Sequence, residues 1–257
     1  MPRTALQFAV ELGDHIIELE APTPEGMGEL RRLYAEENRT SAHIDYGDGF
    51  RFSMNAGDYR APIYAASDLF RSYAVPIHGD LFAELSGSAP LEELGKGRRG
   101  AVLVLPGPRG VPIVRTTTAY TLPAQSFRPV HAALARQIRA CASLATAFNN
   151  ALLEVYTRAY ATMGAHSDQA LDLDEDGELA LFSCYEHHDG GSSRRLMVES
   201  KLPGGPSFEV PLVHGRVVVF SAATNRRFRH RIVLDPATGE PDNRWLGLTF
   251  RTSKTWV

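Results

Sequence analysis

The second half of the chain repeats short apolar segments, several of which alternate hydrophobic and polar residues. Seven such segments follow residue 148, with Gly, Pro and Asp or Asn turns between them. They are NALLEVYT, ELALFSCYE, RRLMVES, SFEVPL, GRVVVFSA, HRIVL and WLGLTFR. A period of two is typical of strands that bury one face. Seven short strands with these turns predict a β-sandwich or a double-sheet barrel.

Two other segments have the spacing and the end signals of helices. Thr23 and Pro24 supply a cap and a helix-starting proline, so EGMGELRRLYAEENR is predicted to be a helix. Pro129 begins a second predicted helix, PVHAALARQIRACASLAT, in which apolar residues recur at helical spacing. Residues 40–127 are rich in Gly and Pro around short apolar runs such as AVLVL, which indicates mostly loops.

No internal repeat and no low-complexity linker divides the chain, so residues 1–257 are expected to form a single domain. We expect residues 1–110 to be a helical and irregular N-terminal extension and residues 111–257 to be the β-barrel core. The predicted fold class is α+β.

Composition and charge limit the expected cellular location and the expected classes of partner. The 257 residues are 44% hydrophobic and 22% charged, which is ordinary for a globular protein. No run approaches the roughly 18 apolar residues that a membrane span needs. The first residues lack a secretory signal, and Cys141 and Cys184 are too few for a disulfide framework, so a cytoplasmic protein is expected. The formal charge of −3 disfavours a large nucleic-acid footprint.

The stretch MGAHSDQALDLDEDG, residues 163–177, contains two overlapping metal signatures. Asp172, Asp174 and Asp176 look like the start of a calcium loop. However, the twelfth position of that loop would be Ser183 instead of a bidentate glutamate, and the surrounding pattern indicates strands instead of helices. This half of the stretch is therefore predicted to be a solvated loop.

The other half contains His166 and Asp168, one of four His-x-Asp copies in the chain. Two histidines and one carboxylate can bind Fe(II) on one face and leave three positions open. Residues two apart on a strand point to the same side, so this pair could supply two ligands. Only this copy has a suitable third ligand downstream, His230, which directly precedes an apolar strand segment. The copies at 43, 78 and 187 are expected to be surface residues.

From about residue 112 to its end, the chain resembles the catalytic core of Fe(II)- and 2-oxoglutarate-dependent dioxygenases, particularly the AlkB-like branch. The resemblance is carried, in order, by PAQSF, LLEVY, GAHSD, VVVF, RHRIVL and LGLTFR. It implies a double-stranded β-helix (jelly-roll) core with supporting N-terminal helices. It also implies Fe(II) and 2-oxoglutarate as cofactors, O₂ as co-substrate, and release of succinate and CO₂. The carboxylate of Asp168 favours hydroxylation or oxidative demethylation over halogenation.

By this resemblance, His166, Asp168 and His230 are the iron ligands and the catalytic residues. Arg251 matches the terminal-strand arginine that binds the distal carboxylate of 2-oxoglutarate. Arg244 is the rival for this role, and Arg251 is ranked slightly ahead. The two are seven residues apart, which places them on opposite faces of a regular strand.

Tyr156 matches a tyrosine whose hydroxyl donates to 2-oxoglutarate, with packing in the core as the alternative. Glu154, on the same strand face, stands where the family commonly has asparagine. Because its charge would repel an anionic cosubstrate, Glu154 is expected to contact the substrate or an arginine.

The substrate is less well defined. RGVPIVRTTTAYTLPAQSF lies where AlkB-like enzymes build part of the substrate lid, so Arg115, Thr116, Thr118 and Tyr120 are candidate contacts. The arginines of residues 225–231 could attract an anionic substrate or form a solvated face. KGRRG at 96–100 is interpreted as a basic loop.

Three functions stay open. The favoured one is an oxygenase acting on a small molecule, such as a natural-product intermediate or a nucleotide. The second is an AlkB-like demethylase or hydroxylase of nucleic acid or protein, with nucleic acid the less favoured partner. The third is a non-enzymatic β-barrel binding module.

Overall fold

The structure is a computed structural model that describes residues 8–12, 15–19, 41–46, 50–55, 69–202, 207–238, 240 and 242–257. For residues 8–55 it describes only the backbone. The strands before residue 128 are β1 (Phe8–Leu12), β2 (His15–Leu19), β3 (Ser41–Tyr46), β4 (Phe50–Asn55), β5 (Arg71–Ala74), β6 (Glu92–Gly95), β7 (Arg98–Val104) and β8 (Gln125–Ser126). The later strands are β9 (Asn150–Tyr156), β10 (Glu178–Tyr185), β11 (Arg194–Ser200), β12 (Ser207–Pro211), β13 (Arg216–Ser221), β14 (Phe228–Leu234) and β15 (Trp245–Arg251). The described helices are α3 (Leu81–Ser86), α4 (Pro129–Ala142) and α5 (Ala222–Arg227).

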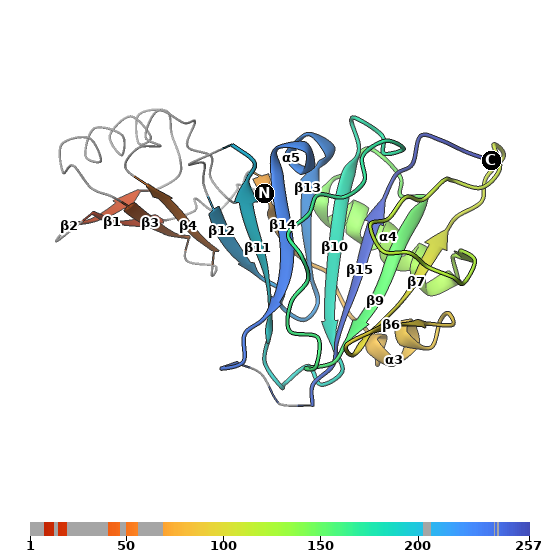
Figure 1. Cartoon of the computed structure of the whole chain (residues 1–257), viewed down its shortest axis with the longest axis horizontal. Helices are drawn as coiled ribbons and strands as arrows, with labels where there is room; N and C mark the ends of the chain where they lie inside the picture. The colour runs from red at the N-terminus through yellow and green to blue at the C-terminus, as the bar shows by residue number, and fades with distance from the viewer. Residues whose placement is uncertain are drawn as a thin grey trace.

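These strands form two sheets that face each other (Figure 1). One has eight strands in the order β5-β13-β10-β15-β9-β7-β6, with β8 paired to β7. The other has seven strands in the order β14-β11-β12-β4-β3-β1-β2. All seven strands predicted after residue 148 are present, and α4 begins at the predicted Pro129.

The chain crosses between the sheets in the manner of a jelly roll. It runs through β9 in the eight-stranded sheet, then beside β14 at the bridges Thr162↔Val233 and His166↔His230, and back to β10. It continues through β11 and β12, returns in β13, crosses to β14 and ends in β15. The predicted double-stranded β-helix core is therefore confirmed.

Alternation along the strands creates two cores. Inward residues of both sheets pack into one core, which includes Tyr156, Phe220 and Trp245. The opposite face of the eight-stranded sheet packs against α3 and α4 through residues such as Leu134 and Ile138. Strands such as β10 are therefore buried on both faces, which explains their nearly continuous apolar pattern.

The first half of the chain contains more strand than the sequence indicated. The segment 71–104, which was expected to be loop-rich, contributes β5, β6 and β7 to the eight-stranded sheet. The expected boundary at residue 110 therefore does not separate an irregular extension from the core. β7 was missed because AVLVL does not alternate. Residues 8–55 contribute β1–β4, whereas the helix predicted after Pro24 lies outside the described residues.

Within the described residues, no helix has the length and apolar character needed to cross a bilayer.

Candidate metal centre

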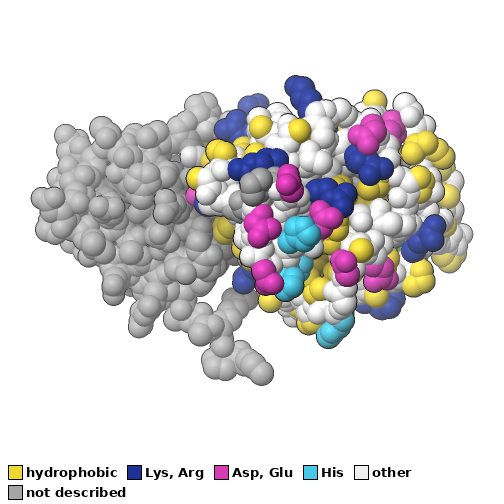
Figure 2. Space-filling model, turned by 90° about the horizontal axis from the view of Figure 1, so that it is seen from below, with side chains coloured by type: hydrophobic (Ala, Val, Ile, Leu, Met, Phe, Trp, Pro, Cys, Tyr) yellow, Lys and Arg dark blue, Asp and Glu magenta, His cyan; other side chains and the backbone are white. Residues whose placement is uncertain are grey.

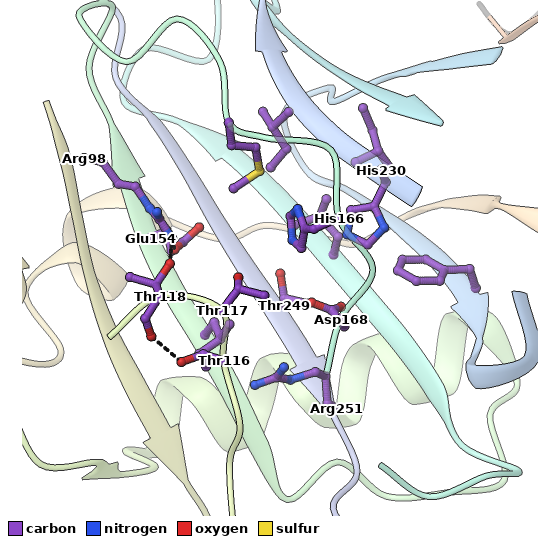
Figure 3. Close-up of a pocket in the computed structure, with 16 residues that line it drawn as sticks. Arg98, Thr116, Thr117, Thr118, Glu154, His166, Asp168, His230, Thr249 and Arg251 are labelled. Carbon is purple, nitrogen blue, oxygen red and sulfur yellow. Dashed lines mark hydrogen bonds and ion pairs between the residues drawn. The ribbon is translucent and has the colours of Figure 1, made fainter. Parts of the chain in front are cut away.

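Three side chains that can ligate a metal converge between the sheets. The ligating atoms of His166, Asp168 and His230 lie within 4.8 Å of one another. Figure 3 shows the three side chains turned toward one another at one end of a pocket. Among the residues that the structure describes, no other group of three His, Cys, Asp or Glu side chains gathers in this way.

A short antiparallel bridge brings the two histidines together. The backbone N–H of His166 donates to the carbonyl of His230 at 3.0 Å, and the N–H of His230 donates back at 2.6 Å. Directly opposed strand residues place their side chains side by side. The two imidazole centroids are accordingly 4.8 Å apart. Backbone pairing thus joins positions that are far apart in sequence.

Asn225 holds the backbone of Asp168 in place from α5. Its Oδ1 accepts from the N–H of Asp168 at 2.9 Å, and its Nδ2 donates to the carbonyl of Asp168 at 2.9 Å. The Asn225 side chain is buried, so these two bonds are its polar contacts in a dry environment. The sequence singled out residues 225–231 only for their arginines, and the role of Asn225 was missed.

The protonation of the imidazoles suits metal binding. Nδ1 of His166 lies 3.0 Å from the carbonyl of Gly164, which can only accept, so the tautomer of the neutral ring that donates here leaves the Nε2 lone pair for a metal. Burial lowers the pKa of His230 to about 4, so this ring is neutral at physiological pH.

Unsatisfied buried atoms show that a metal fits here. Nδ1 of His230 and Oδ2 of Asp168 are buried and have no hydrogen-bond partner. Native proteins rarely leave such atoms unpaired, because each loses its hydration without compensation. Two neutral imidazoles and one carboxylate are a donor set that Fe(II) accepts.

Arg251 lies in the wall of the same pocket. Its Nε donates to Oδ1 of Asn150 at 3.2 Å and its Nη1 to the carbonyl of Arg115 at 3.4 Å, whereas Nη2 has no partner. Burial lowers the pKa of this guanidinium, and the charge of Asp168 opposes that shift. Among the described side chains, no carboxylate is paired with Arg251. It is therefore suited to bind a carboxylate from a ligand.

The other two residues expected at the cosubstrate lie elsewhere or are already engaged. Arg244 pairs with Glu186 through Nε–Oε2 at 2.7 Å and Nη2–Oε1 at 2.5 Å, and it is not among the residues lining the pocket. The hydroxyl of Tyr156 donates to Oε2 of Glu154 at 2.5 Å, and its ring packs against Trp245. Glu154 also contacts an arginine, as the sequence suggested.

That arginine is Arg98, which sequence reasoning missed. It begins β7 and lines the pocket together with Glu154. Its Nε donates to Oε1 of Glu154 at 3.0 Å, and its Nη2 contacts the same oxygen. Arg98 was overlooked because KGRRG was interpreted as a basic loop. However, Arg98 and Arg99 stand at the start of an apolar run, and this pattern could have indicated a strand that begins there.

The segment that follows β7 forms one side of the pocket. Thr116 and Thr118 line it, and Nη2 of Arg98 donates to the hydroxyl of Thr118 at 2.9 Å. Tyr120 donates to Glu154 at 3.1 Å. A Cβ at Gly100 would lie 3.0 Å from the Tyr120 hydroxyl, so the glycine leaves room for this close approach. Arg115, a fourth candidate from this segment, instead pairs with Asp172.

Among the side chains that the structure describes, the remaining metal signatures do not form sites. Asp174 and Asp176 lie in the turn before β10, in agreement with the predicted solvated loop. Asp172 was also expected to be solvated, but it is buried and paired with Arg115. The arginines at 226, 229 and 231 are exposed and are not among the residues that line the pocket. The His-x-Asp copy that begins at His43 lies in β3 instead of a loop, and the structure describes only its backbone.

Figure 2 shows histidine and acidic side chains gathered on the face seen from below. Asp80, Glu186, His188 and His214 line a groove there that includes parts of two further His-x-Asp copies. Nδ1 of His214 accepts from the N–H of Tyr185 at 3.0 Å, so its Nε2 carries the proton and has no lone pair for a metal. Asp80 caps α3 by accepting from the N–H of Ala83.

Comparisons with known proteins find similar solved structures but no matching sequence. No protein-family model and no curated protein sequence matches the chain. Among solved structures it is similar to OsALKBH1, at 15% identity over 67% of this chain and 89% of that one, with a TM-score of 0.46. It is similar to a 2OG-Fe(II) oxygenase family oxidoreductase from Burkholderia pseudomallei, at 13% identity over 66% and 76%, with a TM-score of 0.41. It is also similar to a Pseudomonas putida prolyl-4-hydroxylase, at 16% identity over 71% and 92%, with a TM-score of 0.39.

Proposed function

We propose that the protein is an Fe(II)- and 2-oxoglutarate-dependent dioxygenase that hydroxylates or oxidatively demethylates a small molecule. The observation that carries this proposal is the convergence of His166, Asp168 and His230 within 4.8 Å. The buried, unpartnered Nη2 of Arg251 in the same pocket supports a carboxylate-bearing cosubstrate.

Each residue has a distinct part in this proposal. His166, Asp168 and His230 would hold Fe(II), which supplies O₂-dependent oxidation when three protein ligands leave neighbouring positions open. Arg251 would bind the distal carboxylate of 2-oxoglutarate, because it is the pocket cation without an anionic partner. Leu152, Leu181 and Phe220 line the pocket and would exclude water from it.

A small molecule is the proposed substrate. The pocket lies between two sheets, and its wall combines apolar side chains with a few polar and charged groups, which suits a compact ligand. The exposed arginines near His230 lie outside its lining, and the net charge is −3, so a polynucleotide is not favoured. We also propose a cytoplasmic location, which the free Cys141 and Cys184 thiols support.

The proposal is tested by measuring succinate from 2-oxoglutarate with Fe(II) and O₂. The wild type should release succinate even without substrate, at a slow rate. His166→Ala and His230→Ala should reduce release to the level without protein, while circular dichroism shows a retained fold. Arg226→Ala, at an exposed position outside the pocket lining, is the control and should behave as the wild type. Full activity in either histidine variant would contradict the proposed site.

A further inference from the structure

The pocket has two charged ends that are separated by the uncharged side chains of Leu152 and Thr249. In the strand register, Arg251 lies beside Asn150, whereas Glu154 lies beside Gly247. Asn150 and Glu154 are four residues apart on β9, which corresponds to about 13 Å along a strand. Leu152 lies between them on the same face and lines the pocket. A ligand group at one end therefore meets different side chains from a group at the other end.

The two ends differ in charge. Among the described residues Arg251 forms no ion pair, so its end offers a guanidinium whose Nη2 is free to bind a carboxylate. At the other end, Arg98 is neutralised by Glu154 in an ion pair whose side chains are only 13% and 12% exposed. Thr118 and the hydroxyls of Tyr120 and Tyr156 complete this network. We call the Arg98–Glu154 pair the dipolar wall.

The guanidinium of Arg98 in the dipolar wall is held in its charged form. Burial alone would lower the pKa of Arg98, but the charge of Glu154 and the nearby Tyr156 raise it overall, so the guanidinium stays protonated. Arg98 also lies 5.7 Å over the ring of Tyr160. Its guanidinium contacts use Oε1 of Glu154, whereas Oε2 accepts only from Tyr156. Oε2 of Glu154 can therefore accept a further hydrogen bond, and it lies next to the N–H donors of Arg98.

This arrangement discriminates between ligand charges. A carboxylate placed here would be repelled by Glu154, and an ammonium group would be repelled by Arg98. A neutral group with a carbonyl oxygen next to an N–H satisfies both partners at once. Buried polar groups reject ligands that leave them unpaired, so the wall can select as well as bind.

We propose that Arg98 and Glu154 select a neutral, amide-bearing substrate over an anionic one. This inference rests on the proposed oxygenase function and names the substrate class for the same pocket. It differs from the expectation of an anionic substrate, which depended on arginines that lie outside the pocket lining. A purely structural ion pair would affect stability but would leave ligand preference unchanged.

The test uses benzamide and benzoate, which share a ring and differ in charge. The full-length protein is loaded with Mn(II) and saturated with 2-oxoglutarate, so that the metal and Arg251 are occupied. Mn(II)-dependent relaxation of the probe ring protons is then measured by NMR, with Zn(II)-loaded protein as the diamagnetic reference. In the wild type, benzamide should be relaxed more strongly than benzoate.

Glu154→Gln should shift this preference toward benzoate by about tenfold or more, because it leaves Arg98 as an unpaired cation. The double variant Arg98→Gln, Glu154→Gln should not show this shift toward benzoate, and it should still bind benzamide. Glu178→Gln is the matched control, because Glu178 pairs with Arg71 on the same sheet but is not among the residues lining the pocket.

The proposal is overturned if the wild type shows no preference for benzamide, or if Glu154→Gln keeps the ratio of the Glu178→Gln control. Calorimetry of 2-oxoglutarate binding to the Mn(II)-loaded wild type separates this result from the proposed function. If 2-oxoglutarate fails to bind but Glu154→Gln still shifts the preference toward benzoate, the proposed oxygenase function is wrong. The proposed role of the dipolar wall is then still supported.

Discussion

At the scale of single residues, the sequence predicted those residues whose role follows from their own side-chain chemistry. His166, Asp168 and His230 stood out because their donor types and their positions beside strands are specific. Asn225 and Arg98 did not stand out, because their importance comes from a partner far away in sequence. Asn225 bonds to backbone 57 residues away, and Arg98 pairs with Glu154 at a separation of 56. Spacing patterns do not reveal contacts of this kind.

The two candidate arginines should respond differently to removal. Arg251→Ala should weaken 2-oxoglutarate binding by about 2–3 kcal/mol, roughly 30- to 150-fold, because a charge-assisted pair is lost from a buried site. Arg244→Ala should leave binding unchanged, since its guanidinium pairs with Glu186 outside the pocket lining. Calorimetry on Mn(II)-loaded protein measures both effects. A larger loss in the Arg244 variant would reverse this assignment.

Asn225 should influence the metal without touching it. Asn225→Ala removes both side-chain bonds to the Asp168 backbone, so the carboxylate is held less firmly. We expect Mn(II) affinity to fall by about tenfold, in line with other supporting residues of metal sites. Thermal denaturation of the metal-free protein should show a loss of about 1–3 kcal/mol, because two backbone groups lose their partners. Unchanged Mn(II) affinity would mean that the bonds to Asp168 have no role in positioning it.

At the scale of elements, the helix α4 shows how local signals and tertiary contacts combine. Pro129 predicted the start of the helix, but its first turn is completed by His131, which takes the place of the usual capping acid. Nδ1 of His131 accepts from the N–H of Arg128 at 3.0 Å, so Nε2 carries the proton and donates to Ser88 at 2.7 Å. This chain of bonds links α4 to the end of α3, and it requires a neutral imidazole.

His131 should make stability depend on pH. Burial lowers its pKa from 6.5 to about 4 in the folded protein. The unfolded chain therefore binds more protons below pH 6.5, and the contribution is present above that pH and lost as pH falls toward 4. Between pH 7 and pH 5 this loss is about 2 kcal/mol. Denaturant unfolding should show that His131→Gln loses less stability than the wild type over this interval. Equal losses would contradict the assignment.

At the scale of the whole molecule, the jelly roll was predictable because its seven C-terminal strands have clear apolar segments and turns. The eighth jelly-roll segment was not predicted as a strand, since residues 161–166 pair with β14 only through isolated bridges. β5 and β6 were missed because they have only four residues each, and β7 was missed because it is buried on both faces and does not alternate. The fold thus followed from pattern, whereas the full extent of its sheets required the structure.

The proposed function depends on the crossing of the chain from one sheet to the other. This crossing brings the loop before β10 against β14. The most direct test is X-ray diffraction from crystals soaked with Fe(II) and 2-oxoglutarate under anaerobic conditions, recorded at the iron absorption edge. We predict a single anomalous peak bonded to His166, Asp168 and His230, with ligand density reaching Arg251. A peak at the Asp172–Asp176 turn, or no peak among the three side chains, would contradict the account.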